Sequence, residues 1–392
     1  MVRDALPARC VDWFDALHAA AVAMVGAGDF GSPAYREGLG VLLRAMDATA
    51  RIAPAARRRA FDEIARMLAG RIRAHRGWAA HPHSLAQPLA RPLVIAALPR
   101  TGTSTLQQLL ALDPRFQHLP YWLARMPAVR TPRGQWAADP AHALVEGEIA
   151  GIYAANPGLA RIHLMSADDA DECRLVLMQT FANISIGCNW QVPGYDDWLL
   201  AQDPGPAYRY YADVLRLIGA AEPGRPWLLK CPTHLLGLDR LLEAIPDACI
   251  VQTHRDPAEV VPSNCSAMLT GRHIFEHARS SRRAAGRHNL HVWGTALARA
   301  AAVADARPDR FFHVRYVDLL DDPVGIVRDL YRRFGYTLTA PVEHAMRDWI
   351  ARNPQHRHGV HSYRAADFGL TEAGIRRRFA GYIGRRLGRL PA

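Results

Sequence analysis

The stretch Leu93-Val94-Ile95-Ala96-Ala97-Leu98-Pro99-Arg100-Thr101-Gly102-Thr103-Ser104-Thr105 decides the fold. Its first six residues form a continuous apolar run, which is typical of a strand buried on both faces of a sheet. A glycine-containing loop rich in hydroxyl groups follows, and Leu106, Leu109 and Leu110 then recur at the spacing of one helix face. A strand, such a loop and a helix N-terminus together predict an anion site, because backbone N–H groups converge there and the helix dipole favours negative charge.

This loop differs from the loop of ATP-hydrolysing enzymes. Their version requires G-x-x-x-x-G-K-[ST], whereas here Ala97 stands at the first glycine position and Thr103 at the lysine position. The lysine that would reach the β- and γ-phosphates is therefore absent, which disfavours a Mg-dependent enzyme. A nucleotide kinase with a degenerate loop remains the first alternative. On its own, the loop is also compatible with an ordinary βα turn capped by threonine.

Three further apolar runs follow along the chain. They occupy residues 227–230, 248–251 and 311–314, and the first two run into helical patterns. Strands that alternate with helices predict an α/β fold with a parallel, doubly wound sheet flanked by helices. The segment between the first two strands is too long for a simple crossover. We therefore expect residues 113–225 to form a large helical insertion over the strand ends, where ligands bind in such sheets.

The N-terminal region is predicted to be a helical extension. Ser32-Pro33 is a good N-cap and first-turn pair, and a further helix is expected over residues 55–74. The segment 81–88 has the composition of a linker. A chain of 392 residues is long enough for one large α/β domain plus an appendage. We expect the extension to cover residues 1–88 and the α/β domain to cover residues 89–392.

The composition narrows the class of protein. The chain has 48 Lys and Arg against 37 Asp and Glu, a net charge of +11, yet Lys230 is its sole lysine. Such an arginine bias would follow from a GC-rich coding sequence, and it weakens the step from positive charge to nucleic-acid binding. A non-catalytic, basic nucleic-acid-binding protein is the second alternative. Because we find no helix-turn-helix or aromatic RNA-reading motif, no nucleic-acid partner is expected.

Membrane, export and metal signals are missing from the sequence. No apolar run approaches the ~20 residues that span a bilayer, and Asp4, Arg9 and Asp12 precede the N-terminal apolar stretch, unlike in a signal peptide. The six cysteines form no C-x-x-C pair, which disfavours a zinc site and a disulfide framework and fits a reducing cytoplasm. We expect a cytoplasmic protein with no transmembrane segment and no metal. The sequence leaves the formation of a homo-oligomer open.

Two other strand ends carry chemically useful residues. Arg255 ends the third strand, and Asp256 then provides a helix N-cap, although such an arginine–aspartate pair is also a common salt-bridged cap. Lys230 ends the second strand, and His234 follows shortly after it. A lysine can stabilise charge on a transferred group, and a histidine can take a proton from a hydroxyl at neutral pH.

The first loop resembles that of sulfotransferases that use 3′-phosphoadenosine 5′-phosphosulfate (PAPS). Their phosphosulfate loop reads P-[KR]-[ST]-G-[ST]-[ST] after the first strand, and residues 99–104 match it. A second motif of that family has an arginine at a strand end and a serine eight residues later, as Arg255 and Ser263 do. The resemblance covers residues 92–340. The chain is most similar to large bacterial sulfotransferases that join a helical N-terminal extension to the P-loop-like fold.

The resemblance implies a PAPS site at the carboxyl edge of the sheet. Arg255 and Ser263 would bind the 3′-phosphate. Tyr316, in a segment similar to the Y-x-D segment of the family, would contact adenine, although a core tyrosine fits the pattern equally well. The 5′-phosphosulfate would be held by Arg100, Thr101, Gly102, Thr103, Ser104 and Thr105.

The resemblance also implies in-line transfer of a sulfuryl group to an acceptor hydroxyl, which releases 3′-phosphoadenosine 5′-phosphate (PAP) and needs no metal. His234 would deprotonate the acceptor, while Lys230 and Arg100 stabilise developing charge. Cytosolic sulfotransferases carry this lysine and histidine in a K-T-H segment. Here two extra residues, 231–232, separate Lys230 from Thr233-His234, and the K-x-P spacing is similar to that of Golgi carbohydrate sulfotransferases. Glu172 is the rival base, because some sulfotransferases use a glutamate.

The acceptor site and the end of the chain are the least well defined. Aromatic and methionine residues of the insertion would give a pocket for a small apolar or aromatic hydroxyl compound, such as a phenol, steroid or lipid alcohol. Residues 357–364 resemble, in composition only, the late basic loop that closes on the 3′-phosphate in many sulfotransferases. The tail, residues 375–390, could lie on an anionic membrane, but a docked amphipathic helix is expected.

Overall fold

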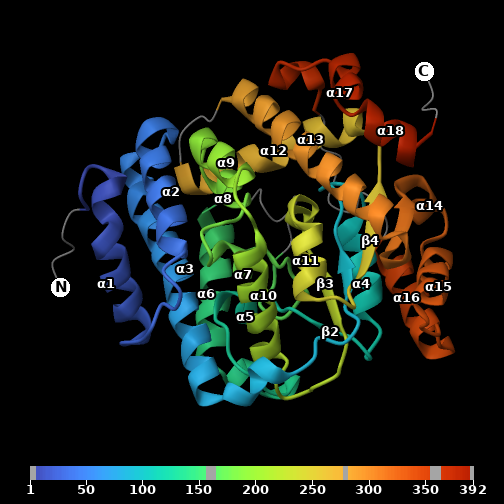
Figure 1. Cartoon of the computed structure of the whole chain (residues 1–392), viewed down its shortest axis with the longest axis horizontal. Coiled ribbons are helices and arrows are strands. Elements are labelled where there is room, and N and C mark those ends of the chain that lie inside the picture. Colours follow the sequence, from blue (N-terminus) through green and yellow to red (C-terminus); the bar gives the residue numbers. More distant parts are fainter. Residues whose placement is uncertain (1–5, 156–164, 277–280, 354–362, 389–392) are drawn as a thin grey trace.

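A five-stranded parallel sheet forms the centre of the α/β region, as predicted (Figure 1). The computed structural model describes residues 6–155, 165–276, 281–353 and 363–388. The strand order is β2-β3-β1-β4-β5. The strands are β1 (Leu93–Ile95), β2 (Gln117–His118), β3 (Trp227–Lys230), β4 (Cys249–His254) and β5 (Phe311–Arg315).

The edge strand β2 is the one element of the sheet that the sequence did not predict. It has two residues and pairs with β3 through the register of Gln117 with Trp227. The predicted helical insertion, residues 113–225, therefore also contains one short strand. Its length explains why it was not predicted, because two residues are too few to show an alternating or continuous apolar pattern. The rest of the insertion consists mainly of helices and loops.

Both faces of the sheet are buried, which explains the continuous apolar run at β1. Val94 belongs to a core that includes residues of α10, α11 and α13, whereas Leu93 and Ile95 belong to a core formed with α4, α15 and α16. The helices that follow and flank the strands are α4 (Thr103–Ala111), α10 (Gly205–Ile218), α11 (Leu238–Ala244), α12 (Pro257–Glu276), α13 (Arg282–Ala306), α14 (Tyr316–Asp321), α15 (Pro323–Phe334) and α16 (Ala340–Arg352).

The N-terminal helices share a core with the insertion. Trp13, Leu17 and Ile64 are buried together with Phe181 and Trp190 of the insertion. Figure 1 shows α1 to α3 on one side of the molecule, with insertion helices between them and the sheet. The elements concerned are α1 (Phe14–Val25), α2 (Tyr35–Thr49), α3 (Pro54–Ala80), α5 (Tyr121–Arg125), α6 (Pro140–Ala155), α7 (Arg174–Met178), α8 (Ile186–Asn189) and α9 (Pro193–Leu200).

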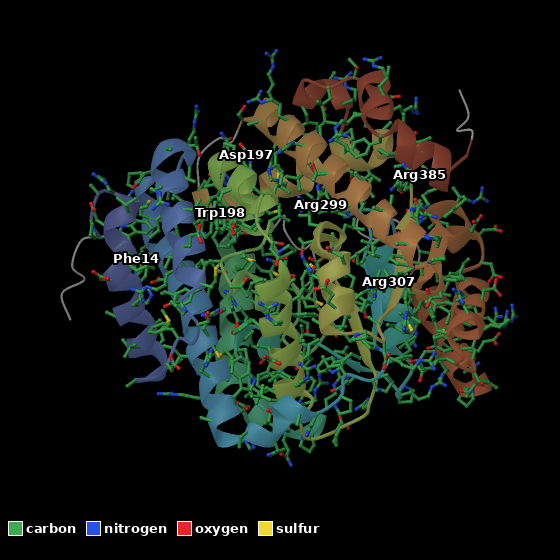
Figure 2. The ribbon with its side chains drawn as sticks, viewed as in Figure 1. Phe14, Asp197, Trp198, Arg299, Arg307 and Arg385 are labelled. Atoms are coloured by element: carbon green, nitrogen blue, oxygen red, sulfur yellow. The ribbon has the colours of Figure 1, made fainter. Side chains whose placement is uncertain are left out.

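The C-terminal helices α17 (Glu372–Arg378) and α18 (Ala380–Arg386) dock on α13. Ile375 and Phe379 are buried in the main core, and Arg385 pairs with Asp305 of α13 at 3.3 Å. Figure 2 shows Arg385 beside the C-terminal half of α13. The apolar face of this tail is thus covered by the protein itself. The predicted late basic loop falls largely within residues 354–362, which lie outside the described residues.

Among the described residues, no helix is both long enough and apolar enough to cross a membrane. The six cysteines are all free thiols.

Candidate active site

The loop between β1 and α4 contains two residues in the left-handed region of backbone conformation. Arg100 and Gly102 have φ angles of 67° and 83°, and Gly102 is the N-cap of α4. A Cβ atom at Gly102 would lie 2.9 Å from Leu319 and 3.1 Å from the ring of Tyr316. Only glycine therefore lets this loop lie directly against α14, with the N-terminus of α4 pointing out of the loop.

Thr101 fixes the loop to the sheet. Its hydroxyl is fully buried, donates to the carbonyl oxygen of Leu98 at 2.7 Å and lies 2.6 Å from the hydroxyl of Thr253 on β4. This side chain therefore faces the core, and only its backbone N–H remains for an anion. By contrast, Ser104 and Thr105 are exposed in the first turn of α4.

The two predicted donor motifs meet in space although more than 150 residues separate them. Arg100 Nε donates to the hydroxyl of Ser263 on α12 at 3.2 Å, and Arg255 Nη1 donates to the carbonyl oxygen of Arg100 at 3.2 Å. The Arg255 guanidinium lies 4.4 Å from the ring centre of Tyr316 and pairs with Glu259 at 2.5 Å. Arginines, hydroxyls and an aromatic ring thus lie at one edge of the sheet.

Lys230 forms an ion pair with Glu172. Its Nζ lies 2.8 Å from Glu172 Oε1, and the lysine is almost completely buried. Burial lowers the pKa of Lys230, but the Glu172 carboxylate outweighs it and leaves the pKa raised, so the lysine stays charged. The backbone explains why these residues meet, because the N–H of Cys173 donates to the carbonyl oxygen of Lys230 at 3.0 Å.

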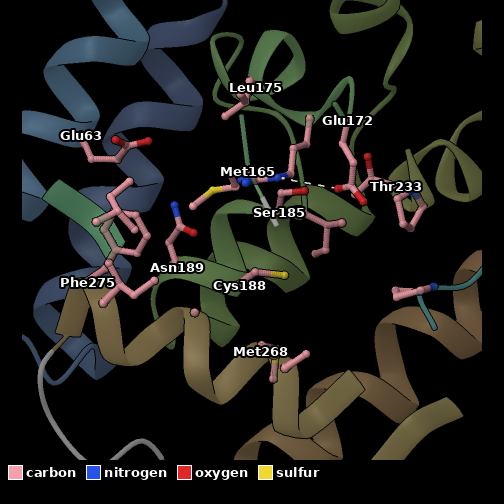
Figure 3. Close-up of a pocket in the computed structure, with 18 of the residues that line it drawn as sticks. Glu63, Met165, Glu172, Leu175, Ser185, Cys188, Asn189, Thr233, Met268 and Phe275 are labelled. Carbon is pink, nitrogen blue, oxygen red and sulfur yellow. Dashed lines mark ion pairs between the residues drawn. The ribbon is translucent and has the colours of Figure 1, made fainter. Parts of the chain in front are cut away.

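Arg174 approaches the same carboxylate from the other side. Its Nε lies 3.7 Å from Glu172 Oε2, and the ion pair is drawn in Figure 3. Burial lowers the pKa of Arg174, but Glu172 more than offsets this effect and the net change is a rise. Glu172 therefore contacts two cations, Lys230 through one carboxylate oxygen and Arg174 through the other.

His234 lies in the core. It is completely buried, its Nδ1 is 3.1 Å from the Tyr208 hydroxyl, and the rings of Tyr208 and Tyr211 pack against it. Its Nε2 has no hydrogen-bond partner among the residues that the structure describes. Burial lowers the pKa of His234 to about 3, so the imidazole is neutral at physiological pH. This burial disfavours the prediction that His234 is the base.

One cavity of about 540 Å³ connects these elements. Arg100, Thr103 and Ser104 line it beside Glu172 and Thr233, whereas His234 is not among its described lining residues. The apolar part of its wall includes Tyr121, Ile152, Met165, Leu175, Ile184, Met268, Ile274, Phe275 and Trp293. A volume of this size is typical of sites for small organic molecules.

The charged residues that line the cavity from α3, α5 and α6 were not predicted from the sequence. Glu63 and Arg66 come from α3, Arg125 from α5 and Glu148 from α6. Arg174 was also missed. These residues belong to helices whose mutual placement depends on tertiary packing, and no short motif links them.

The match to a family model covers most of the α/β region. The model described as "Sulfotransferase family" matches residues 92–340. The chain belongs to this sulfotransferase family. The structure of sulfotransferase STF1 from Mycobacterium tuberculosis H37Rv is 35% identical, with a TM-score of 0.84, over 97% of this chain and 100% of that one.

A second sulfotransferase structure gives the same result. STF9 from Mycobacterium avium is 27% identical, with a TM-score of 0.86, over 96% of this chain and 97% of that one. The likeness therefore includes the N-terminal helices as well as the sheet. The comparison with curated proteins gives no significant match. The P-loop-like sulfotransferase fold and the family thus agree with the sequence-based expectation.

Proposed function

We propose that this sulfotransferase transfers a sulfuryl group from PAPS to a hydroxyl of a small, largely apolar acceptor. The observation that carries the proposal is that Arg100 and Glu172 line the same cavity. Lys230 forms an ion pair with Glu172, and Arg255 donates a hydrogen bond to the backbone carbonyl oxygen of Arg100. A cationic loop and a carboxylate thus flank the same space. This is the arrangement that sulfuryl transfer from an anionic donor to an alcohol requires.

The donor would lie along the carboxyl edge of the sheet. The N-terminus of α4 and Arg100 would hold the 5′-phosphosulfate, with the hydroxyls of Thr103, Ser104 and Thr105 nearby. Arg255 and Ser263 would hold the 3′-phosphate, and Tyr316 would contact the adenine. PAPS supplies a sulfuryl group bonded to a phosphate that can leave with its electron pair.

Glu172 is proposed as the general base in place of His234. Glu172 lines the cavity, whereas His234 is buried among tyrosines. As the acceptor oxygen bonds to sulfur, its proton moves to the Glu172 carboxylate, the bond between sulfur and the phosphate oxygen breaks, and the electron pair leaves with PAP. Arg100, which lines the cavity, and Lys230, which pairs with Glu172, would neutralise the charge that develops on these oxygens, so the step is proposed to need no metal.

The ion pair between Lys230 and Glu172 has a consequence for this step. A carboxylate that faces a cation at 2.8 Å is a poor proton acceptor, because the cation stabilises its charged form. An anionic donor next to Lys230 would draw the ammonium toward the sulfuryl oxygens and weaken the pair. Donor binding would thereby make Glu172 more basic.

The experiment that tests the proposed function is a transfer assay with ³⁵S-labelled PAPS. The purified chain would be incubated with phenols, sterols, sugars and lipid alcohols, and label in each product would be measured. We expect transfer to at least one largely apolar alcohol, unchanged by EDTA. Mg-dependent phosphoryl transfer from ATP, with no sulfuryl transfer to any acceptor and no PAP binding, would favour the kinase alternative instead.

A further inference from the structure

The C-terminal helices contact the chain on both sides of Arg255. Arg376 of α17 donates to Asp256 Oδ2, from Nε at 3.2 Å and from Nη2 at 2.9 Å. The hydroxyl of Tyr382 on α18 lies 3.1 Å from Nδ1 of His254. Since α17 also packs on α12 and α13 (Figure 1), the end of the chain lies over the junction between β4 and α12.

The contact of α17 is made to the residue that caps α12. Asp256 is largely buried, and its Oδ1 accepts a hydrogen bond from the backbone N–H of Ala258 at 2.9 Å. Its other carboxylate oxygen takes both bonds from Arg376. The arginine therefore fixes the first turn of α12, the helix that also carries Ser263.

The contact of α18 is made to the last residue of β4. His254 is buried, its Nε2 lies 2.9 Å from Nδ1 of His313 on β5, and its ring centre lies 5.5 Å from that of Tyr382. The Tyr382 hydroxyl also interacts with the backbone of Arg255. One hydroxyl group thus contacts both the end of the strand and the arginine that follows it.

The sheet alone does not fix the position of Arg255. The last register pair between β4 and β5 joins His254 to Arg315, so Arg255 lies one residue beyond it. Its guanidinium lies over the ring of Tyr316 and donates to the carbonyl oxygen of Arg100. A binding group has to be held to within roughly 0.5 Å of its productive position, so the backbone that carries this guanidinium has to be fixed as well.

These polar contacts are distinct from what docks the tail. Ile375 and Phe379 are buried in the main core, and burial of apolar side chains supplies most of the free energy of such docking. Arg376 and Tyr382 instead direct their polar atoms at the two neighbours of Arg255. A role in orienting that residue explains why they lie there.

We propose that Arg376 and Tyr382 are positioning residues for the 3′-phosphate of the donor. This inference rests on the proposed function, which assigns Arg255 to that phosphate. By holding residues 254–256, the two side chains set the direction in which the Arg255 guanidinium points. They act through Arg255 and do not themselves touch the nucleotide.

Calorimetry with PAP and with AMP on the full chain provides the test. Tyr382→Phe removes one oxygen and keeps the ring, whereas Arg376→Gln removes the ion pair. Each variant should weaken PAP by about three- to tenfold, the range expected when one hydrogen bond is lost, and should change AMP by less than about twofold. The control is Arg385→Gln, because Arg385 lies on α18, is 57% exposed and pairs with Asp305. The control should bind both nucleotides as the wild type does.

A double-mutant cycle separates positioning from a merely structural role. If Tyr382 acts through Arg255, adding Tyr382→Phe to Arg255→Ala should cause no further loss of PAP affinity, because the group that it positions is gone. General loosening of the fold would instead weaken PAP and AMP alike, and it would add to the loss caused by Arg255→Ala. If Arg376→Gln does not fold, Tyr382→Phe and its cycle decide the question.

The outcomes distinguish this inference from the proposed function. Wild-type PAP affinity in Tyr382→Phe, equal losses for PAP and AMP, or an additive loss in the cycle would overturn the positioning role. The donor site would stand in all three cases, provided that the wild type binds PAP and Arg255→Ala weakens it. If the wild type does not bind PAP, the proposed function fails and the positioning role fails with it.

Discussion

The two ends of the cavity are built in different ways. At the end proposed to bind the donor, which Arg100 lines, Arg100, Lys230 and Arg255 each follow or end a strand, and the carboxyl ends of parallel strands meet at one edge of the sheet. At the far end, Glu63 and Arg125 come from separate helices and meet only because those helices pack together. A parallel sheet thus brings the residues of short sequence motifs together at one edge, whereas a pocket between helices depends on how those helices pack.

The largest expected effect concerns Glu172, the proposed general base. Glu172→Gln should lower kcat by about 10³-fold, because general-base catalysis contributes roughly that much, while PAP affinity changes little. Steady-state rates with the best acceptor would measure it, after thermal unfolding has confirmed that the variant is folded. Glu146→Gln is the control, since Glu146 is 62% exposed on α6. A Glu172→Gln variant with the wild-type kcat would contradict the assignment.

The next effect concerns the arginine proposed to bind the 3′-phosphate. Arg255→Ala should weaken PAP by about 10- to 100-fold, the range expected for a charge-assisted hydrogen bond, and should leave AMP nearly unchanged because AMP lacks the 3′-phosphate. Calorimetry would measure both ligands. Arg315→Ala is a matched control, because Arg315 ends β5, pairs with Asp318 and is exposed. Equal losses for PAP and AMP would show that Arg255 does not read the 3′-phosphate.

A smaller effect is expected from two glycine variants, which separate the cost of backbone strain from the cost of filling the space beside Gly102. Gly102→Ala and Gly224→Ala both place alanine at a φ angle above 80°, which costs about 1–2 kcal/mol of stability. Only at Gly102 would the new Cβ also meet Tyr316 and Leu319, because nothing lies within 4 Å at Gly224. Both variants should unfold at lower denaturant concentration, but only Gly102→Ala should lose PAP affinity. A similar loss of affinity in Gly224→Ala would mean that global destabilisation is the cause.

The smallest effect tests whether His234 belongs to the core and not to the donor end. Burial lowers its pKa to about 3 in the folded chain, against about 6.5 when unfolded. Between these values the unfolded chain binds the extra proton, so stability falls as the pH falls, by up to about 1.4 kcal/mol per pH unit. Urea unfolding at pH 7, 6 and 5 should show a shallower dependence in His234→Gln.

An exposed histidine provides the comparison for that experiment. The side chain of His344 is 79% exposed, so His344→Gln removes an imidazole that folding does not bury and serves as the control for the substitution itself. If His234→Gln has the same dependence as the wild type, burial of His234 does not contribute to the acid sensitivity.

The residues placed by the strands could be predicted from the sequence, whereas the cavity residues placed by the packing of helices could not. Residues 99–104 and the spacing of Arg255 and Ser263 were sufficient to predict that these two segments meet at one edge of the sheet, because strands fix where those residues go. Glu172 was only a rival base, since its acidic surroundings look like a solvated helix start. Glu172 lies beside Lys230 because the backbone N–H of Cys173 donates a hydrogen bond to the carbonyl oxygen of Lys230. No pattern of side chains in the sequence predicts that hydrogen bond. His234 is the opposite case. It follows Lys230 closely in the chain, but it is buried in the core and is not among the described residues that line the cavity.

Arg100, Ser263 and Arg255 are proposed to form one site for a nucleoside 3′,5′-bisphosphate. Calorimetric titration of the wild-type chain with PAP and with AMP tests it most directly. We predict that PAP binds with a 1:1 stoichiometry and at least about tenfold more tightly than AMP, as one additional charge-assisted contact requires. Equal affinity for the two nucleotides, or no binding of PAP, would show that these three residues do not form such a site.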